Sequence, residues 1–318
     1  MSGISKRTFL KAAAAAGGLS FLNCSFAAAA QTASGSQEPA TVNFLKELSA
    51  DSLIKAFDAV KAPLTGKIAV KLHTGEPNGP NILPRPWVQK LIEHIPNSTI
   101  VETNVLYGSP RQTTEGHRPT LKTNGSTFAP VDILDEDGDI NWPIAGGKHL
   151  KEVAVGAHLA NYDSMLVLTH FKGHAMAGFG GSLKNIAIGC ASGRNGKRQI
   201  HRNWDTGSQF LERMVEGGKA VTDHFGEKIV YINVLRRMSV DCDCAGTSAA
   251  EPKVPDLGIL ASTDILAIDQ ASIDMVWALP EKQKHDLVER IESREGLHQL
   301  SYMQELGMGR RQYRIVNL

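Results

Sequence analysis

A short apolar run that leads into a glycine-rich stretch limits the folds open to this chain. Residues 163–169 read DSMLVLT, a run typical of a strand buried inside a parallel sheet. Residues 178–189 follow as GFGGSLKNIAIG, which predicts a loop that enters a short helix. Glycines admit a ligand close to the backbone, and a helix start offers free N–H groups. We therefore predict that Gly178, Gly180 and Gly181 contact a cofactor or another small molecule.

The flanking sequence indicates the rest of the fold. A strand at 67–73, a helix at 86–94 and a strand at 98–104 form a βαβ unit, which favours a parallel sheet. Further strands are predicted at 130–134, 151–155, 228–234, 257–262 and 311–316, and loops at 106–125 and 240–246. Helices are predicted at 208–225, 265–279, 284–293 and 298–306, and residues 41–60 have apolar residues at helical spacing with a break near Ser49. We predict an α/β fold over residues 41–318, with a mostly parallel sheet covered by helices. It forms one large domain or two lobes that divide near residue 160.

The first 30 residues are typical of an export signal. Lys6, Arg7 and Lys11 precede an alanine-rich apolar run that ends in a small-residue cleavage site at Ala30. The segment resembles a twin-arginine signal peptide in which Lys6 replaces the first arginine, and an ordinary secretory signal is the alternative. The resemblance implies a bacterial periplasmic or exported protein that the twin-arginine export machinery carries already folded. A small, polar linker is predicted at residues 31–40.

Charge and hydropathy argue against two kinds of partner. Three of the 34 lysines and arginines lie in the leader, so 31 remain against 33 acidic residues, a formal charge of −2. A nucleic-acid partner would require a basic stripe, and this balance argues against one. No apolar run after the leader approaches the ~18 residues of a transmembrane helix, so we predict no membrane span after cleavage.

A lysine and two histidines in the central stretch are candidate functional groups. Lys184 lies among leucine, isoleucine and alanine residues, where a desolvated amine could act as a nucleophile. His174 directly precedes the glycine cluster, and we interpret it as a catalytic group or a structural residue. His170 and His174 could share a metal on a helix, but the glycines disfavour a helix here. His170, at a strand end, is more typical of a structural hydrogen-bonding residue, and the residues alone leave His201 unassigned.

The cysteines suggest a metal centre. Cys190, Cys242 and Cys244 remain after cleavage, while Cys24 in the leader lies in a poor context for a lipid anchor. An odd number does not make a disulfide framework. Two thiolates two residues apart can reach one soft metal, as in zinc and iron–sulfur sites, and Cys190 is the remaining cysteine that could join them. The alternative is a pair of half-buried thiols or an oxidised pair. No ferredoxin module is present.

Arginines beside proline-stiffened turns are candidate anion contacts. Arg85, Arg111 and Arg118 suit carboxylate or phosphate recognition, with surface salt bridges as the alternative. Nucleotide fingerprints are absent. Gly193 is misplaced for a phosphate loop, and Arg198 stands where such a loop requires a Ser or Thr. The cluster at 178–181 lacks the third glycine of a dinucleotide site.

The chain resembles the domain-of-unknown-function family 362. The segments that carry the resemblance are NVLYGSPR from residue 104, THFKGHAMAGFGGSLKNIAIGCAS from residue 169, CDC from residue 242 and PDLGILASTDILAIDQASID from residue 255. The resemblance extends from about residue 67 to residue 276. Some members of this family carry a ferredoxin module with iron–sulfur clusters, which this chain lacks. The resemblance implies a family but no reaction.

The central motif is also similar to that of lactate racemases that carry a nickel-pincer nucleotide. The similarity implies that Lys184 attaches the cofactor and that His201 ligates nickel. It further implies that His174 and His117 are the acid–base pair and that Arg85 contacts substrate or phosphate. The chain departs from that pattern at the Gly-His-Arg-Pro turn, which lacks a spacer residue, and in its additional cysteines.

Three functions follow as hypotheses. The first is a metal- or cofactor-dependent enzyme of the cell envelope, with redox chemistry at a centre that contains iron–sulfur, zinc or nickel, and with an electron-transfer partner. The second is a racemase or isomerase of small hydroxy acids that uses a pincer-type nickel cofactor. The third is a non-catalytic carrier of a metal or a small-molecule ligand. The first two are enzymes, and the third predicts stoichiometric binding without turnover.

Overall fold

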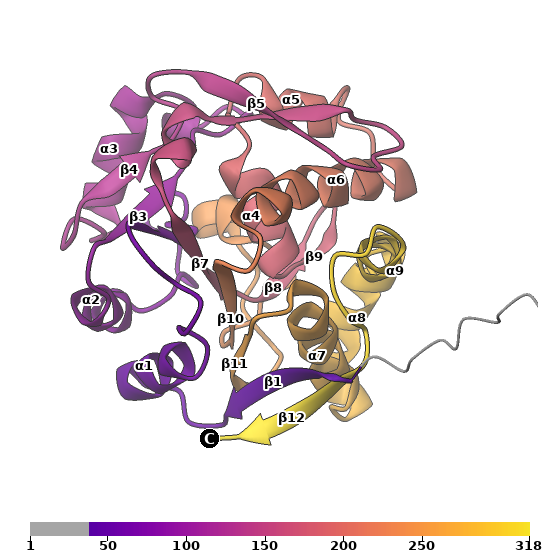
Figure 1. The fold of residues 1–318 in the computed structure, drawn as a ribbon. Helices are drawn as coiled ribbons and strands as arrows, with labels where there is room; N and C mark the ends of the chain where they lie inside the picture. Colours follow the sequence, from indigo (N-terminus) through magenta and orange to yellow (C-terminus); the bar gives the residue numbers. More distant parts are fainter. Residues whose placement is uncertain (1–37) are drawn as a thin grey trace, which may run out of the picture. The chain divides into compact units, whose positions relative to one another are not determined.

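The computed structural model describes residues 38–318. The main feature of this part of the chain is an eight-stranded sheet. The strands lie in the order β12 (Tyr313–Asn317), β1 (Ala40–Leu45), β11 (Gly258–Ser262), β10 (Ile229–Leu235), β7 (Ser164–His170), β2 (Ile68–Lys71), β3 (Ser98–Glu102) and β4 (Val131–Ile133). Neighbouring strands are parallel except where β11 pairs with β1 and with β10. The predicted α/β fold with a mostly parallel sheet is therefore confirmed (Figure 1).

Alternate side chains of the strands pack into two separate apolar layers. In β7, Leu166 and Leu168 belong to one layer, and Met165 and Val167 belong to the other. Successive side chains of a strand point to opposite faces, so a strand that is covered on both faces is apolar throughout. Figure 1 shows one face covered by α1 (Ala50–Asp58) and α2 (Arg85–His94) and the other by α4 (Ser182–Cys190) and α6 (Ser208–Phe225). The helix α7 (Ile265–Trp277) packs on the same face as α4.

The chain leaves the neighbouring strands β2 and β7 in opposite directions. From β2 it passes through α2 to β3, and from β7 it passes through α4 and α6 to β10 on the other side. The two strands are paired in register from Ile68 with Ser164 to Lys71 with Val167. Where connections diverge in this way, the loops at the carboxyl ends of the strands leave a crevice, and ligands of open α/β sheets bind there.

The remaining elements extend the loops at this edge or cover the sheet. They are the hairpins β5 (Asp139–Pro143) with β6 (Glu152–Gly156) and β8 (Lys172–His174) with β9 (Gly178–Gly180), the helices α3 (Thr114–Thr123), α5 (Gly196–His201), α8 (Glu281–Ser293) and α9 (His298–Glu305), and the 3₁₀ turns η1 (Pro110–Gln112), η2 (Ala157–Asn161) and η3 (Asp243–Ser248). Among the described helices, none combines the length and the hydrophobicity that crossing a bilayer requires.

The prediction of a helix over residues 41–60 is wrong for its first part. Residues 40–45 form β1, and a helix begins only at Ala50, with Ser49 as its N-cap. The spacing of apolar residues in this segment fits a helix as well as a strand. Pairing with β11 and β12 decides between them, because these strands supply partners from more than 210 residues away in the sequence.

The prediction of a loop over residues 106–125 is also wrong in part, because α3 occupies Thr114–Thr123. The helix contains Gly116 and Pro119, which disfavour helix interiors. Thr113 caps its first turn by accepting a hydrogen bond from the N–H of Gly116. Packing against η1 then stabilises a helix that the local sequence does not favour.

Strands from both sides of residue 160 lie next to one another in the sheet, since β2 pairs with β7 and β1 pairs with β11. The described residues therefore show no division into lobes at that point. The predicted signal peptide, Cys24 and residues 31–37 of the predicted linker lie outside the described residues.

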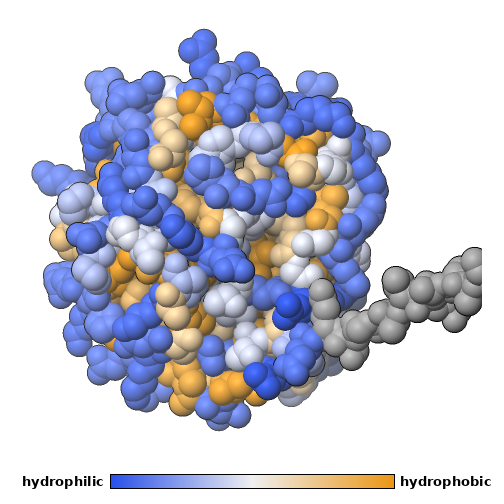
Figure 2. Space-filling view, in the orientation of Figure 1, coloured by the Kyte–Doolittle hydropathy of each residue, from blue (hydrophilic) through white to orange (hydrophobic). Residues whose placement is uncertain are grey.

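Figure 2 shows a largely hydrophilic face with apolar side chains visible between polar ones. The large apolar side chains exposed in the described part are Trp204, Ile315 and Leu318.

Candidate functional site

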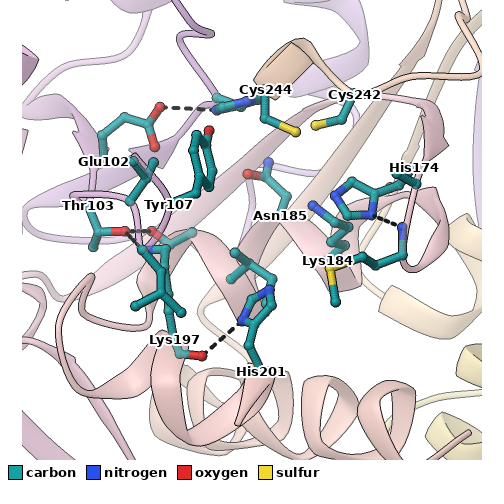
Figure 3. A pocket seen from close by; sticks show the side chains of 18 of the residues that line it. Glu102, Thr103, Tyr107, His174, Lys184, Asn185, Lys197, His201, Cys242 and Cys244 are labelled. Atoms are coloured by element: carbon teal, nitrogen blue, oxygen red, sulfur yellow. Dashed lines mark hydrogen bonds and ion pairs between the residues drawn. The ribbon is translucent and has the colours of Figure 1, made fainter. Parts of the chain in front are cut away.

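A cavity of about 350 Å³ lies at the carboxyl ends of β2, β3 and β7. Its walls come from these strand ends, the β8–β9 hairpin, α4, α5 and the segment that leads into η3. Figure 3 shows that the side chains of Lys184, His174, His201 and the two cysteines of the Cys-Asp-Cys segment converge on it. Residues distant in the sequence thus meet at the crevice between β2 and β7, where the topology predicts a ligand site.

Two thiols and an imidazole form a tight group on the cavity wall. One ligand atom each from His174, Cys242 and Cys244 lies within 4.8 Å of the others. Asp243, between the two cysteines, is buried and accepts hydrogen bonds from His170 (2.9 Å) and Lys172 (3.0 Å). These two contacts fix the segment to the end of β7, and both flanking thiols line the cavity. The interpretation of His170 as a structural residue agrees with this contact.

The pKa values of the two thiols are shifted in opposite directions. A hydrogen bond from Cys244 holds the pKa of Cys242 well below that of an ordinary thiol, and the ammonium groups of Lys184 and Lys172 act in the same direction. The pKa of Cys244 is raised because its S–H group is the donor in this hydrogen bond and because it is buried. Cys242 is therefore the thiolate of the pair, and thiolates are the form in which cysteine binds metals.

The imidazole of His174 is neutral and fixed in orientation. Burial lowers its pKa well below the ordinary value, and the nearby Lys184 ammonium adds to this effect. Its Nδ1 accepts hydrogen bonds from the backbone N–H groups of Met176 (3.1 Å) and Ala177 (3.0 Å). In the neutral ring Nε2 must then carry the proton. A metal can therefore bind Nε2 only after the proton has moved to Nδ1, a change of tautomer that breaks the two hydrogen bonds from the backbone.

Lys184 and His201 complete the functional side of the cavity. Lys184 is partly exposed, and its ammonium forms no hydrogen bond or ion pair with any described residue. Burial lowers the pKa of His201 to about 4, so its ring is neutral at neutral pH. Its Nδ1 donates to the carbonyl oxygen of Lys197 at 2.9 Å, which leaves the lone pair on Nε2. A free ammonium and a free imidazole lone pair therefore line one cavity.

The remaining cations of the cavity are held by internal partners. Glu102 accepts hydrogen bonds from Lys71 (2.9 Å) and Arg111 (3.1 Å). Although burial opposes it, these two cations hold the pKa of Glu102 well below its ordinary value. Burial lowers the pKa of Lys197 to about 8, and its ammonium donates to three oxygens, among them Thr103 Oγ1 at 2.6 Å. Five cations line the cavity against one carboxylate and the Cys242 thiolate, and two of them, Lys184 and Lys197, have no carboxylate partner among the described residues. This excess of cations favours an anionic ligand.

Four of the predicted site residues do not line this cavity. Cys190 is fully buried in α4, and burial raises the pKa of its thiol to about 12. His117 lies behind Arg111, whose Nε donates to its Nε2 at 3.1 Å, and burial lowers its pKa to about 3. Arg85 lines a separate, much smaller hollow. A Cβ on Gly178 would lie 2.8 Å from the Cα of Gly296, so this glycine serves backbone packing.

The N-terminus of α4 is not free to bind an anion, contrary to our expectation from the glycine cluster. Asp269 of α7 accepts hydrogen bonds from the N–H groups of Ser182 (2.8 Å) and Leu183 (3.0 Å). A Cβ on Gly181 would lie 2.4 Å from this carboxylate, so the glycine makes room for Asp269. Gly180 does line the cavity, next to the side chain of Lys184.

Sequence reasoning missed Lys71, Glu102, Lys172 and Trp204, all of which line the cavity. For Lys71 and Glu102 a signal existed, because each is the charged last residue of an otherwise apolar or β-branched strand, IAVK and STIVE. Carboxyl ends of neighbouring parallel strands meet at one edge of a sheet, so these charges could have been placed together. No local pattern marks Trp204.

The comparison with protein families decides the membership of the chain. The pattern of the family described as "Domain of unknown function (DUF362)" matches residues 68–274. The chain belongs to this family. The family prediction made from the sequence is confirmed, and the matched residues of this DUF362 protein run from β2 to α7, which includes all residues of the thiol–imidazole group.

Solved structures show two further likenesses. The lactate racemase apoprotein from Thermoanaerobacterium thermosaccharolyticum is 10% identical, with a TM-score of 0.42 over 74% of this chain and 57% of that one. A Thermotoga maritima protein solved by a structural genomics consortium is 12% identical, with a TM-score of 0.36 over 60% of this chain and 51% of that one. The DUF362 chain thus spans between half and three fifths of each of these proteins. No curated protein matches it in sequence.

Proposed function

We propose that this protein is a metal-dependent enzyme that acts on a small anionic substrate. The observation that carries the proposal is the convergence of Cys242, Cys244 and His174 within 4.8 Å on the wall of a cavity lined by an excess of cations. Clustered soft donors, a cavity of about 350 Å³ and perturbed pKa values in one place are the usual signature of an active site.

The donor set fits one soft divalent ion. Two thiolates and one imidazole supply three ligands, and a three-ligand site keeps a coordination position open for water or substrate. Zinc and nickel both accept such ligands. Cys190 is not in the group, so the described cysteines do not supply the four thiolates of an iron–sulfur cluster. The two hydrogen bonds to Nδ1 of His174 orient its ring, and coordination through Nε2 would require the tautomer with the proton on Nδ1, in which these hydrogen bonds are lost.

We assign separate roles to the proposed metal ion and to the side chains around this group. When bound, a Lewis-acidic ion would polarise a carbonyl or hydroxyl oxygen of the substrate. Lys184 has no carboxylate partner among the described residues and binds the negative charge of the substrate. His201 is neutral, has a lone pair on Nε2 and accepts a proton. Lys71 and Arg111 are already paired with Glu102 and give the cavity its fixed positive wall.

Metal analysis tests the proposal. We expect elemental analysis by plasma mass spectrometry to find about one zinc or nickel ion per chain in protein purified from its native host. Cys242→Ser and Cys244→Ser should each reduce this content strongly. Cys190→Ser is the matched control and should retain it, because that thiol lies outside the group. Equal metal content in wild type and Cys242→Ser contradicts the proposal.

A second candidate function is a racemase or isomerase with a pincer-type nickel cofactor attached to Lys184. The unpartnered ammonium of Lys184 and the available Nε2 of His201, both on the cavity wall, favour it. Against it, His117 is bound to Arg111 rather than to the cavity. Intact mass of protein from a host that makes the cofactor separates the two candidates. A mass adduct that disappears in Lys184→Met supports the second, and an unmodified mass removes it.

Export remains a proposal that rests on the first 30 residues. We propose that the mature protein functions outside the cytoplasm after transport in the folded state, when its metal is already bound. Fractionation of cells should recover the cleaved form in the periplasm, and replacement of both Lys6 and Arg7 by Gln should retain the uncleaved form inside. Redox chemistry and an electron-transfer partner remain predictions from the sequence.

A further inference from the structure

Trp204 is the most exposed of the large apolar side chains that line the cavity. It is 48% exposed and lines the cavity, whereas the other exposed large apolar residues of the described chain, Ile315 and Leu318, lie at its carboxyl end. A single exposed apolar side chain is ordinary on a protein surface, but in the lining of a concave site such a side chain is placed to contact a ligand. Nothing in the proposed metal chemistry uses this residue.

The backbone around Trp204 adopts a strained conformation that hydrogen bonds and an ion pair hold in place. Arg202 and Trp204 have φ angles of +47° and +62°, a conformation that residues other than glycine rarely adopt. The N–H of Trp204 donates to the carbonyl oxygen of His201 at 2.8 Å. Asp205, the next residue, forms an ion pair with the fully buried Arg213, which also donates to the carbonyl oxygen of Ile200 at 2.8 Å. The position of the ring is therefore built in advance of ligand binding.

The faces of the Trp204 ring are not fully used inside the protein. Its aromatic partner among the described residues is His201, with ring centroids 5.1 Å apart and planes tilted by 58°, which is not a stacked arrangement. Although cations surround the cavity, none lies over this ring, while Trp87 has Arg236 over its own. One flat face of the Trp204 ring is thus available to stack on a planar group of a ligand, and the cations of the cavity are available to bind the negative charge of that ligand.

We infer that Trp204 is a specificity-determining residue, and that the substrate is an anion with an aromatic or conjugated ring. The inference deepens the proposed function, because it rests on the anionic substrate proposed there. The ring of the substrate stacks on Trp204, and its charged group lies toward Lys184. The apolar side chains of Leu106, Met176 and Ile188 in the lining contact the body of such a molecule.

Calorimetric titration of the purified full chain with matched probes tests the inference. The probes are phenylacetate, which is planar and charged, cyclohexylacetate, which is apolar but not planar, acetate, and the neutral 2-phenylethanol. We expect phenylacetate to bind about tenfold more tightly than cyclohexylacetate, a ratio within reach of one aromatic contact. Trp204→Ala should abolish this ratio, and Trp204→Phe should restore most of it. Trp87→Ala is the matched control, because Trp87 lies outside the cavity, and should leave the ratio unchanged.

Each remaining outcome is decisive. Lys184→Met should weaken phenylacetate and cyclohexylacetate equally, since it removes the contact to the charge alone. The inference is overturned if the affinity ratio is unchanged in Trp204→Ala. It is also overturned if wild type binds the two acids with equal affinity or does not bind phenylacetate. Metal content is measured on the same samples. A sample without metal that still prefers phenylacetate through Trp204 supports the inference independently of the metal-dependent function, which the metal content of protein from the native host tests.

Discussion

At the scale of single residues, the cavity depends on buried charges that neutralise one another. Glu102 is buried and accepts hydrogen bonds from Lys71, Arg111 and Thr74. Each of these groups would be costly to bury alone, and the arrangement is stable because every charge has a partner. The network also fixes the ends of β2 and β3, so the cavity wall and the stability of the fold depend on the same side chains.

Glu102→Gln should lower the free energy of unfolding by about 3–5 kcal/mol at pH 7, since it leaves Lys71 without a carboxylate and Arg111 with Glu76 alone. The pKa of Glu102 is depressed in the folded state, so its contribution is complete above the ordinary value of 4.5 and is lost as the pH falls further. Urea unfolding at pH 7 and pH 4 measures this. A difference between variant and wild type that stays constant, or grows toward acid pH, contradicts the account.

At the scale of elements, the position of α4 is set by a residue of another helix. Asp269 of α7 caps the first turn of α4 and also accepts a hydrogen bond from Asn233 of β10 at 2.9 Å. Two helices and a strand are thereby joined at the point where the glycine cluster ends. Lys184 directly follows the two residues whose N–H groups are capped, so its direction depends on this cap.

The stabilisation that Asp269 gives to the folded chain depends on pH. Burial raises the pKa of Asp269 to about 6, so its stabilising contribution is present in acid and is lost as the pH rises through 6. Relative to Asp269→Asn, wild type should therefore lose on the order of 2–3 kcal/mol of unfolding free energy between pH 4 and pH 7. Urea unfolding across this range measures it. Asp274→Asn, an exposed site on the same helix, is the control and should show no such trend.

At the scale of the whole molecule, the proposed metal joins loops that follow different strands. His174 follows β7, and the two cysteines follow β10. A metal bound there stabilises the folded chain by mass action, about 2.7 kcal/mol at a free concentration one hundred times the dissociation constant. Zinc or nickel should therefore raise the Tm of chelator-treated protein by several degrees in calorimetry. The Cys242→Ser/Cys244→Ser double variant should show no shift, and a shift of equal size there would refute the site.

The sequence predicted the elements whose identity depends on local pattern. The apolar run at β7, the βαβ unit around α2 and the amphipathic α6 were all visible in it. β1 and α3 were not, because pairing over more than 210 residues and packing on η1 decide their structure. The same holds for the glycine cluster, whose anion-binding donors turned out to be occupied by Asp269.

For the site, the sequence by itself determined the chemical groups: an amine, imidazoles and a pair of thiols, each carried by a segment with a recognisable pattern. Only the tertiary structure decided which of them meet. It brings Lys184, His174, His201, Cys242 and Cys244 to one cavity and leaves Cys190, His117 and Arg85 away from it. The reason is physical. Chemical type belongs to a residue, but proximity depends on strand order and on the direction in which each connection leaves the sheet, and no local pattern encodes either.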